Sequence, residues 1–216
     1  MTTTPIRQAA RRGERPAYDR DSLLKVAVAV FNERGYHATG MEELAKRLGL
    51  SKSSIYHHVS GKEELLDLAV TRALDALFAV LDEGPPPGAT TDPLRHVVRR
   101  SVEVLAKELP YVTLLLRVHG DSEVEQRALD RRREFDRRVA ELAVREAAEG
   151  GVRNDIDPHL TSRLLFGTVN SLIEWYRPDG DLSVEGLANA VTTMLFDGLS
   201  SSGRQGPSAI GSRHRA

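Results

Sequence analysis

The sequence predicts an all-α protein, with an N-terminal three-helix domain that contains a helix-turn-helix and a larger C-terminal helical domain. Apolar residues recur along most of the chain at the spacing of amphipathic helices. Glycine, proline and capping residues separate these stretches, and no stretch alternates as a strand does. We place the two domains at 18–64 and 65–200, between a flexible basic arm at 1–17 and a disordered tail at 201–216.

Charge is distributed unevenly along the chain. Residues 1–62 hold 11 Lys and Arg against 6 Asp and Glu, whereas residues 63–199 hold 16 against 25. The 3 arginines of the tail bring the net charge to -1. A basic N-terminal part suits a polyanionic partner, because phosphate binding releases counterions. Two interpretations stay open for the arginines of the arm, a DNA-following arm or a solvated tail: Arg7, Arg11, Arg12 and Arg15.

Several classes of function are excluded by what the sequence lacks. There is no cysteine, which excludes disulfides, thiolate metal sites and a cysteine nucleophile. We find no nucleophile elbow, phosphate loop, dinucleotide motif or zinc-protease motif, so we expect no enzyme, no cofactor and no metal. No apolar run is long enough to span a membrane and no signal sequence is visible. We therefore expect a cytoplasmic protein without a membrane partner.

The N-terminal domain begins with a helix predicted at 21–34, which Gly35 ends. Tyr36 is expected to pack beside its apolar stripe. Two short helices at 41–48 and 52–59 follow, joined by a tight turn. The stripe of the first helix consists of Leu23, Leu24, Ala27, Val30 and Phe31.

The turn between the two short helices has a physical reason at each position. Ala45 is small where the helices cross, Gly49 can take the left-handed conformation, and Ser51 can cap the next helix. Capping boxes are also predicted where a hydroxyl precedes a glutamate by three residues: Thr39 with Glu42, and Ser60 with Glu63. The helix after the turn offers short polar, aromatic and imidazole side chains suited to a DNA major groove: Lys52, Ser53, Ser54, Tyr56, His57 and His58.

Six helices are predicted for the C-terminal domain, separated by glycine and proline. Their expected ranges are 62–83, 93–109, 110–120, 122–149, 158–176 and 183–199. Residues 84–88 form a loop, and the helix at 110–120 is apolar nearly all round, so it should lie centrally. The last two helices are apolar enough to form a four-helix bundle with a second copy, although burial within one chain is the alternative.

A continuous set of motifs lies between Leu23 and Leu66. It comprises Gly35-Tyr36, Thr39, Glu42, Leu44-Ala45, Leu48-Gly49-Leu50-Ser51-Lys52, Ile55-Tyr56-His57-His58 and Lys62-Glu63-Glu64-Leu65-Leu66. On these residues the chain resembles the TetR/AcrR family of transcriptional repressors. The resemblance implies a homodimer that binds a palindromic operator in double-stranded DNA, with a C-terminal domain for ligand binding and dimerisation.

The resemblance also implies roles for individual residues in DNA binding. Thr39, Tyr56 and Lys62 match positions that contact phosphates. Positions near base edges or the backbone are matched by Lys52, Ser53, Ser54 and His57. The chain departs from the family pattern at Gly40, where a hydroxyl is usual, and at Val59, where an aromatic residue is usual. We expect Val59 to remain an apolar plug.

An effector pocket among the middle helices is implied in the same way. Its candidate lining residues are Leu105, Leu109, Val112, Leu116, His119, Phe135, Val139, Phe166, Asn170, Ile173 and Trp175. For most of these, plain core packing is the alternative. Asn170 needs a hydrogen-bond partner in an apolar helix, which is either a ligand or a neighbouring carbonyl.

The effector class is suggested by a pattern at 165–180, Leu-Phe-Gly-x-x-Asn followed by Glu-Trp-Tyr-Arg-Pro-Asp-Gly. It is similar to a pattern in TetR-like repressors of fatty-acid, steroid and aromatic-acid catabolism, whose effectors are acyl-CoA thioesters. Arginines that could meet the phosphates, or instead form a salt-bridged solvent face or a nucleic-acid surface, are Arg131, Arg132, Arg137 and Arg138. Two alternatives stay open: a multidrug-type sensor that uses Glu174 for a cation, and a ligand-free DNA-binding or interaction protein.

Overall fold

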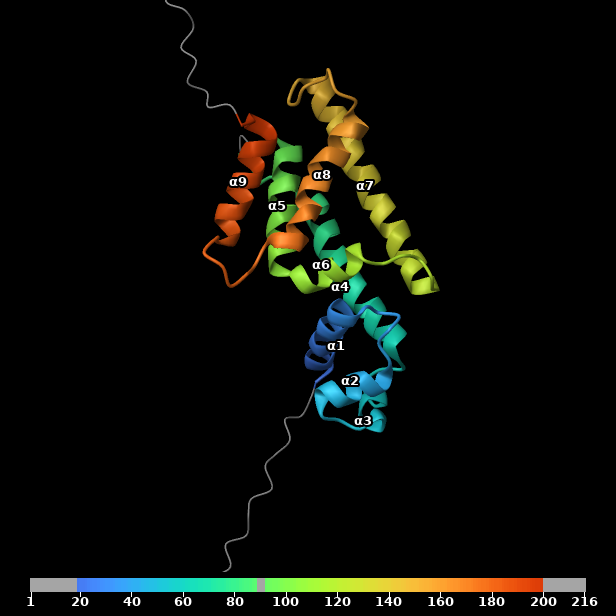
Figure 1. Ribbon diagram of the computed structural model, residues 1–216. Coiled ribbons are helices and arrows are strands. Elements are labelled where there is room, and N and C mark those ends of the chain that lie inside the picture. Colours follow the sequence, from blue (N-terminus) through green and yellow to red (C-terminus); the bar gives the residue numbers. More distant parts are fainter. Residues whose placement is uncertain (1–18, 89–91, 200–216) are drawn as a thin grey trace, which may run out of the picture. The chain divides into compact units, whose positions relative to one another are not determined.

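The computed structural model describes residues 19–88 and 92–199, and these ranges contain nine helices and no strand (Figure 1). The predicted arm at 1–17 and tail at 201–216 lie outside the described residues. The chain divides into two compact units, residues 1–65 and 66–216. Within the described ranges, no helix has the length and apolarity that crossing a membrane requires.

The N-terminal unit contains α1 (Arg20–Arg34), α2 (Met41–Leu48), α3 (Lys52–Tyr56) and the first turn of α4 (Lys62–Glu83). Its core is made of fully buried apolar side chains: Leu23, Ala27, Val28, Leu44 and Ile55. Tyr36 packs edge-on against Phe31, with ring centroids 5.2 Å apart, as the sequence predicted. Gly35 ends α1 with φ 87°.

The turn between α2 and α3 is built as predicted. Gly49 has φ 65°, which an L-residue with a side chain rarely adopts, and Ser51 Oγ accepts a hydrogen bond of 3.1 Å from the Ser54 N–H. The second helix of the helix-turn-helix, called the recognition helix below, is shorter than the predicted 52–59. Helix α3 ends at Tyr56, and the two histidines that follow lie in a turn. Val59 is buried at 3% exposure and serves as the expected plug.

Both predicted capping boxes are wrong. The residue that caps α2 is Gly40, and the Thr39 hydroxyl donates instead to the Gly35 carbonyl at 2.8 Å. At the start of α4 the Ser60 N–H and hydroxyl donate to Glu64 Oε2, at 2.6 and 2.8 Å, rather than to Glu63. The reason is that α4 starts at Lys62, one residue later than a box capped by Ser60 requires, so its third helical position is 64 and not 63.

The C-terminal unit contains the rest of α4 and five further helices. These are α5 (Pro93–Lys107), α6 (Leu109–Leu116), α7 (Glu123–Glu149), α8 (Pro158–Trp175) and α9 (Val184–Asp197). Helix α5 packs against α9, α8, α7 and α6, while α7 also packs along α8 (Figure 1). Residues 111–115 of α6 are all buried, which confirms its central place.

Candidate DNA-binding surface and effector site

Helix α3 presents a polar surface made of several predicted DNA-binding residues. Ser53 and His57 are exposed, and Tyr56 keeps 51% of its surface open to solvent. Ser54 is half-buried and its hydroxyl lies 2.8 Å from the Ser51 hydroxyl, so it takes part in the cap of the helix. Ser53 and Tyr56 of α3, with His57 of the turn that follows, are therefore the side chains with the most freedom to meet a groove.

Lys52, at the start of α3, forms an ion pair with Glu42 of α2. The hydrogen bond and charge of Lys52 lower the pKa of Glu42 below its ordinary value, so this carboxylate is ionised at neutral pH. Both side chains are exposed. A phosphate would have to compete with Glu42 for the Lys52 ammonium group.

The ammonium group of the half-buried Lys62 lies against the loop between α1 and α2. It donates to the carbonyls of Tyr36 at 3.2 Å, Thr39 at 3.2 Å and His37 at 3.5 Å. It also lies 4.5 Å from the centroid of the Tyr36 ring. Lys62 thus joins the first turn of α4 to the loop between α1 and α2. Its role as a phosphate ligand stays a prediction.

Thr39 is 1% exposed, and its hydroxyl proton is used by the Gly35 carbonyl. A phosphate contact by this side chain also stays a prediction.

Within the C-terminal unit, a narrow cavity of about 50 Å³ lies among α4, α5, α6, α7 and α8. Six predicted residues line it: Leu105, Val112, Leu116, Phe135, Phe166 and Asn170. The others do not. Val139 is fully buried in the core, Leu109 and Ile173 are half-buried elsewhere, and His119 and Trp175 are exposed.

Six residues that line the cavity were not predicted as site residues: Leu74, Leu77, Ser101, Leu115, Asp136 and Val169. A seventh, Arg132, was predicted as a phosphate ligand rather than as part of the cavity lining. Leu74 and Leu77 were visible as part of the apolar stripe of α4, and Leu115 as part of the all-apolar α6. The polar residues gave a weaker signal. Each of them interrupts the apolar face of its helix. The pattern of one helix does not show which space between helices this face will line.

The cavity carries three polar side chains besides Asn170. Ser101 is 1% exposed, and its hydroxyl has no hydrogen-bond partner among the residues that the structure describes. Arg132 donates to the Leu115 carbonyl at 3.4 Å, and burial lowers the pKa of its guanidinium group. Part of the Asp136 residue is open to solvent, but the surrounding protein removes water from its carboxyl group and so raises the pKa of that group. The positive charges of Arg132 and Arg163 lower this pKa and offset the increase only in part.

A larger groove of about 730 Å³ runs between α7 and α8 and the segment before α8. Asp136, Phe166 and Asn170 line both the groove and the cavity, so the two spaces meet at these residues. Three arginines and a histidine line the groove alone: Arg133, Arg137, Arg163 and His159. Asp136 and Asp157 also line the groove, so its charged side chains are three arginines and two aspartates, next to a mainly apolar cavity.

Two of the arginines predicted as phosphate ligands face α4 instead of the groove. Arg131 pairs with Asp75 at 2.7 Å and Arg138 pairs with Asp82 at 2.7 Å. Both guanidinium groups also lie near the Phe78 ring, at 5.3 and 5.8 Å from its centroid. These two arginines hold α7 to α4, which leaves Arg137 as the predicted arginine at the groove.

Helices α8 and α9 leave apolar side chains uncovered. The exposed fractions are 48% for Leu160, 56% for Leu164, 54% for Trp175 and 38% for Met194. Leu160 and Leu164 lie one turn apart on α8, so they share a face. This face has the composition of a contact surface rather than of a solvated helix.

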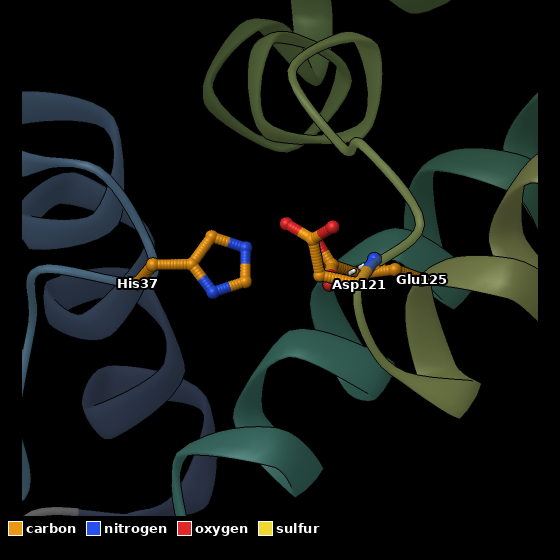
Figure 2. A group of neighbouring side chains, drawn as sticks. All are labelled: His37, Asp121 and Glu125. Carbon is orange, nitrogen blue, oxygen red and sulfur yellow. Dashed lines mark hydrogen bonds between the residues drawn. The ribbon is translucent and has the colours of Figure 1, made fainter.

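Local hydrogen bonds stabilise the start of α7. Two of the residues that form them, Asp121 and Glu125, are drawn in Figure 2. The Asp121 N–H donates to Glu125 Oε2 at 3.1 Å, and Ser122 Oγ accepts from the Glu125 N–H at 3.3 Å. Glu125 is buried at 2% exposure, where its charge also interacts favourably with the helix dipole. Asp121 and Glu125 therefore have a capping role. His37, the third residue drawn, belongs to the N-terminal unit.

Comparison with known proteins agrees with this arrangement. Residues 23–69 match the profile "Bacterial regulatory proteins, tetR family", and residues 87–199 match "Tetracyclin repressor-like, C-terminal domain". The chain is 30% identical over 213 residues to the HTH-type transcriptional repressor KstR2 of Rhodococcus jostii, covering 93% of this chain and 98% of that protein.

Two solved structures are similar over most of their length. SCO3833, a TetR regulator from Streptomyces coelicolor A3, is 54% identical, with a TM-score of 0.79 over 88% of this chain and 94% of that one. The ketosteroid transcriptional regulator KstR2 of Mycobacterium tuberculosis is 26% identical, with a TM-score of 0.73 over 83% and 93%. The chain therefore belongs to the TetR family of bacterial regulatory proteins and is a TetR-type transcriptional repressor, not an enzyme.

Proposed function

We propose that this repressor binds a palindromic operator as a homodimer and is released from it by an acyl-CoA thioester. The observation that carries the effector class is the junction at Asp136, Phe166 and Asn170, where the mainly apolar cavity adjoins a groove that holds three arginines. An acyl-CoA has the matching polarity, because its acyl group is apolar and its nucleotide end carries phosphates. Arginine is the side chain best suited to hold those phosphates.

Among the groove arginines, Arg163 is the strongest candidate for a phosphate ligand. No carboxylate oxygen lies within 4 Å of its guanidinium group in the described chain, whereas Arg133 pairs with Asp130 and Arg137 pairs with Glu134. A ligand that uses Arg163 therefore displaces no existing ion pair. His159 at the same groove adds a second group that a phosphate can meet.

The small cavity supports a link between effector binding and conformational change. A volume of about 50 Å³ holds only part of an acyl group, so an effector must move the walls apart to enter fully. Those walls include Leu74 and Leu77 of α4, the helix whose first turn belongs to the N-terminal unit. Binding would then favour a state in which the two recognition helices no longer fit the operator.

The relatives are consistent with this class of effector. The relative from Rhodococcus jostii is named a transcriptional repressor, and the solved structure from Mycobacterium tuberculosis is described as a ketosteroid transcriptional regulator. A third relative, 23% identical over 190 residues, is the fatty acid metabolism regulator protein of Bacillus subtilis. The cation-sensor alternative has less support, because Glu174 is exposed and lines neither the cavity nor the groove.

The homodimer is supported by the uncovered apolar face of α8 and α9. Leu164 and Trp175 are more than half exposed, and a second copy that packs its α8 and α9 against them would bury both. A two-fold dimer presents two copies of α3 to two half-sites, which is why a palindrome is the expected operator.

Calorimetric titration of the full chain tests the effector class. We expect an acyl-CoA to bind and the corresponding free acid to bind far more weakly, because the acid lacks the phosphates. Arg163→Ala should weaken binding of the thioester about tenfold, since a hydrogen bond to a charged group is lost.

Arg153→Ala is the matched control for this titration. Arg153 pairs with Asp155 on the surface and lines neither the cavity nor the groove, so its loss should leave the affinity unchanged. Failure of every thioester to bind would refute the proposed effector class.

A further inference from the structure

We infer that Ser101 selects an effector whose acyl part carries a keto or hydroxyl oxygen. The inference rests on the proposed function and adds the chemistry of the acyl group to it. Ser101 lies on α5, and it is the one serine or threonine among the residues that line the cavity.

The Ser101 hydroxyl is buried and unpaired. Its residue is 1% exposed, and its Oγ has no hydrogen-bond partner among the described residues. Most of the cavity wall around it consists of leucine, valine and phenylalanine side chains. A buried hydroxyl without a partner costs free energy, which a ligand oxygen at hydrogen-bond distance would recover.

Two hydroxyls on other helices of this unit are satisfied by their own backbone. Thr168 Oγ1 donates to the Leu164 carbonyl at 3.1 Å, and Thr192 Oγ1 donates to the Ala188 carbonyl at 2.7 Å. Ser101 makes no bond of this kind, although the preceding turn of α5 offers carbonyls in the same positions. Its hydroxyl is therefore not engaged by the backbone, and a ligand that moves the cavity walls apart would be able to bond to it.

The position of Ser101 also indicates which part of an acyl-CoA it meets. Asn170 lines both spaces, so it lies where the thioester would pass from cavity to groove. Ser101 lines the cavity alone and belongs to the space for the acyl group. A hydroxyl donates and accepts, so it can pair with a keto oxygen or with a hydroxyl group.

The test compares matched thioesters by calorimetry. Hexanoyl-CoA is titrated against its keto and hydroxy derivatives, with the oxygen moved one carbon at a time along the chain. We expect at least one derivative to bind the wild-type protein about tenfold more tightly than hexanoyl-CoA, because a site with a buried polar group discriminates against a ligand that leaves it unpaired.

Ser101→Ala should abolish this preference and leave hexanoyl-CoA binding equal or tighter. Ser171→Ala is the control, because Ser171 is exposed on α8 and lines neither space. Unchanged operator binding by Ser101→Ala without effector would show that the variant is folded.

Three results overturn the inference alone. The first is equal binding of hexanoyl-CoA and all its derivatives, and the second is a preference that survives in Ser101→Ala. An equal loss of affinity for every thioester in Ser101→Ala would assign its hydroxyl to the thioester carbonyl and also overturn the selection. Absence of binding by any acyl-CoA would refute the proposed function together with the inference.

Discussion

Replacement of Lys62 by methionine separates two roles that this side chain could have. The side chain keeps its length and apolar stem but loses the ammonium group that meets the Tyr36, His37 and Thr39 carbonyls. If Lys62 mainly anchors the α1–α2 loop to α4, the N-terminal unit should lose stability even without DNA. If it mainly holds a phosphate, stability should hardly change.

The size of the effect follows from the contacts. Hydrogen bonds to a charged group contribute about 1.5–3 kcal/mol when well made, but two of these are 3.2 Å long, one is 3.5 Å and the lysine is half-buried. The ring contact at 4.5 Å adds roughly 0.5–1 kcal/mol. After allowance for water that replaces the ammonium group, we expect a loss of about 2 kcal/mol.

Hydrogen exchange measured by peptide mass spectrometry is the suitable assay. The single tryptophan, Trp175, lies in the C-terminal unit and reports only on that unit. Amides of α2 should exchange about thirtyfold faster in Lys62→Met, which is the factor that corresponds to 2 kcal/mol. Lys46→Met, which removes an exposed charge from α2, is the control and should leave the exchange of the α2 amides nearly unchanged.

Unchanged hydrogen exchange in Lys62→Met would refute the role of Lys62 in anchoring the α1–α2 loop to α4. In that case a salt dependence of operator binding reduced by about 0.9 in slope would assign Lys62 to one phosphate.

The remaining predictions concern specificity, assembly and pH. Ser53→Asn should change the preferred operator sequence in a binding-site selection, with little change in salt slope, because Ser53 is exposed on α3 and takes no part in the Ser51 cap; an unchanged preference would remove it from base contact. Leu164→Glu should convert dimers to monomers in analytical ultracentrifugation and weaken operator binding, whereas Val144→Glu, an equally apolar exposed site on α7, should not; a dimer that survives would contradict the proposed interface. The raised pKa of Asp136 means that its ionisation opposes folding, so this destabilisation is absent below the ordinary pKa of an aspartate and grows as pH rises through the raised value. Protonation also removes a negative charge beside a polyanionic effector, so acyl-CoA affinity should rise toward acid pH less steeply in Asp136→Asn than in the wild type; equal pH profiles would exclude a role of Asp136 in this dependence.

Much of the fold could be predicted because its signals are local. The helix pattern, Gly49 and Ser51 define the helix-turn-helix within a few residues, and tertiary packing has only to agree with them. The two predicted capping boxes were wrong because they too rest only on a local signal. A hydroxyl and a glutamate three residues apart match the motif, but the match cannot tell whether the helix starts at one residue or the next.

The site could be predicted only in part, because it depends on contacts between distant segments. Five of the nine apolar residues that line the cavity were predicted as site residues, among them Leu105 and Phe166. The partners of Lys62 come from a loop more than twenty residues earlier, which no spacing indicates. Arg137 and Arg138 are adjacent in sequence, yet a rotation of about 100° per residue turns one to the groove and the other to Asp82.

The central claim is most directly tested by an electrophoretic shift of DNA from upstream of the protein's own gene, with and without a panel of acyl-CoA thioesters and their free acids. The proposed function predicts a shifted complex that one class of thioester abolishes and that the free acids leave intact. A complex that no thioester affects would contradict the effector class, and the absence of any specific complex would contradict operator binding at this site.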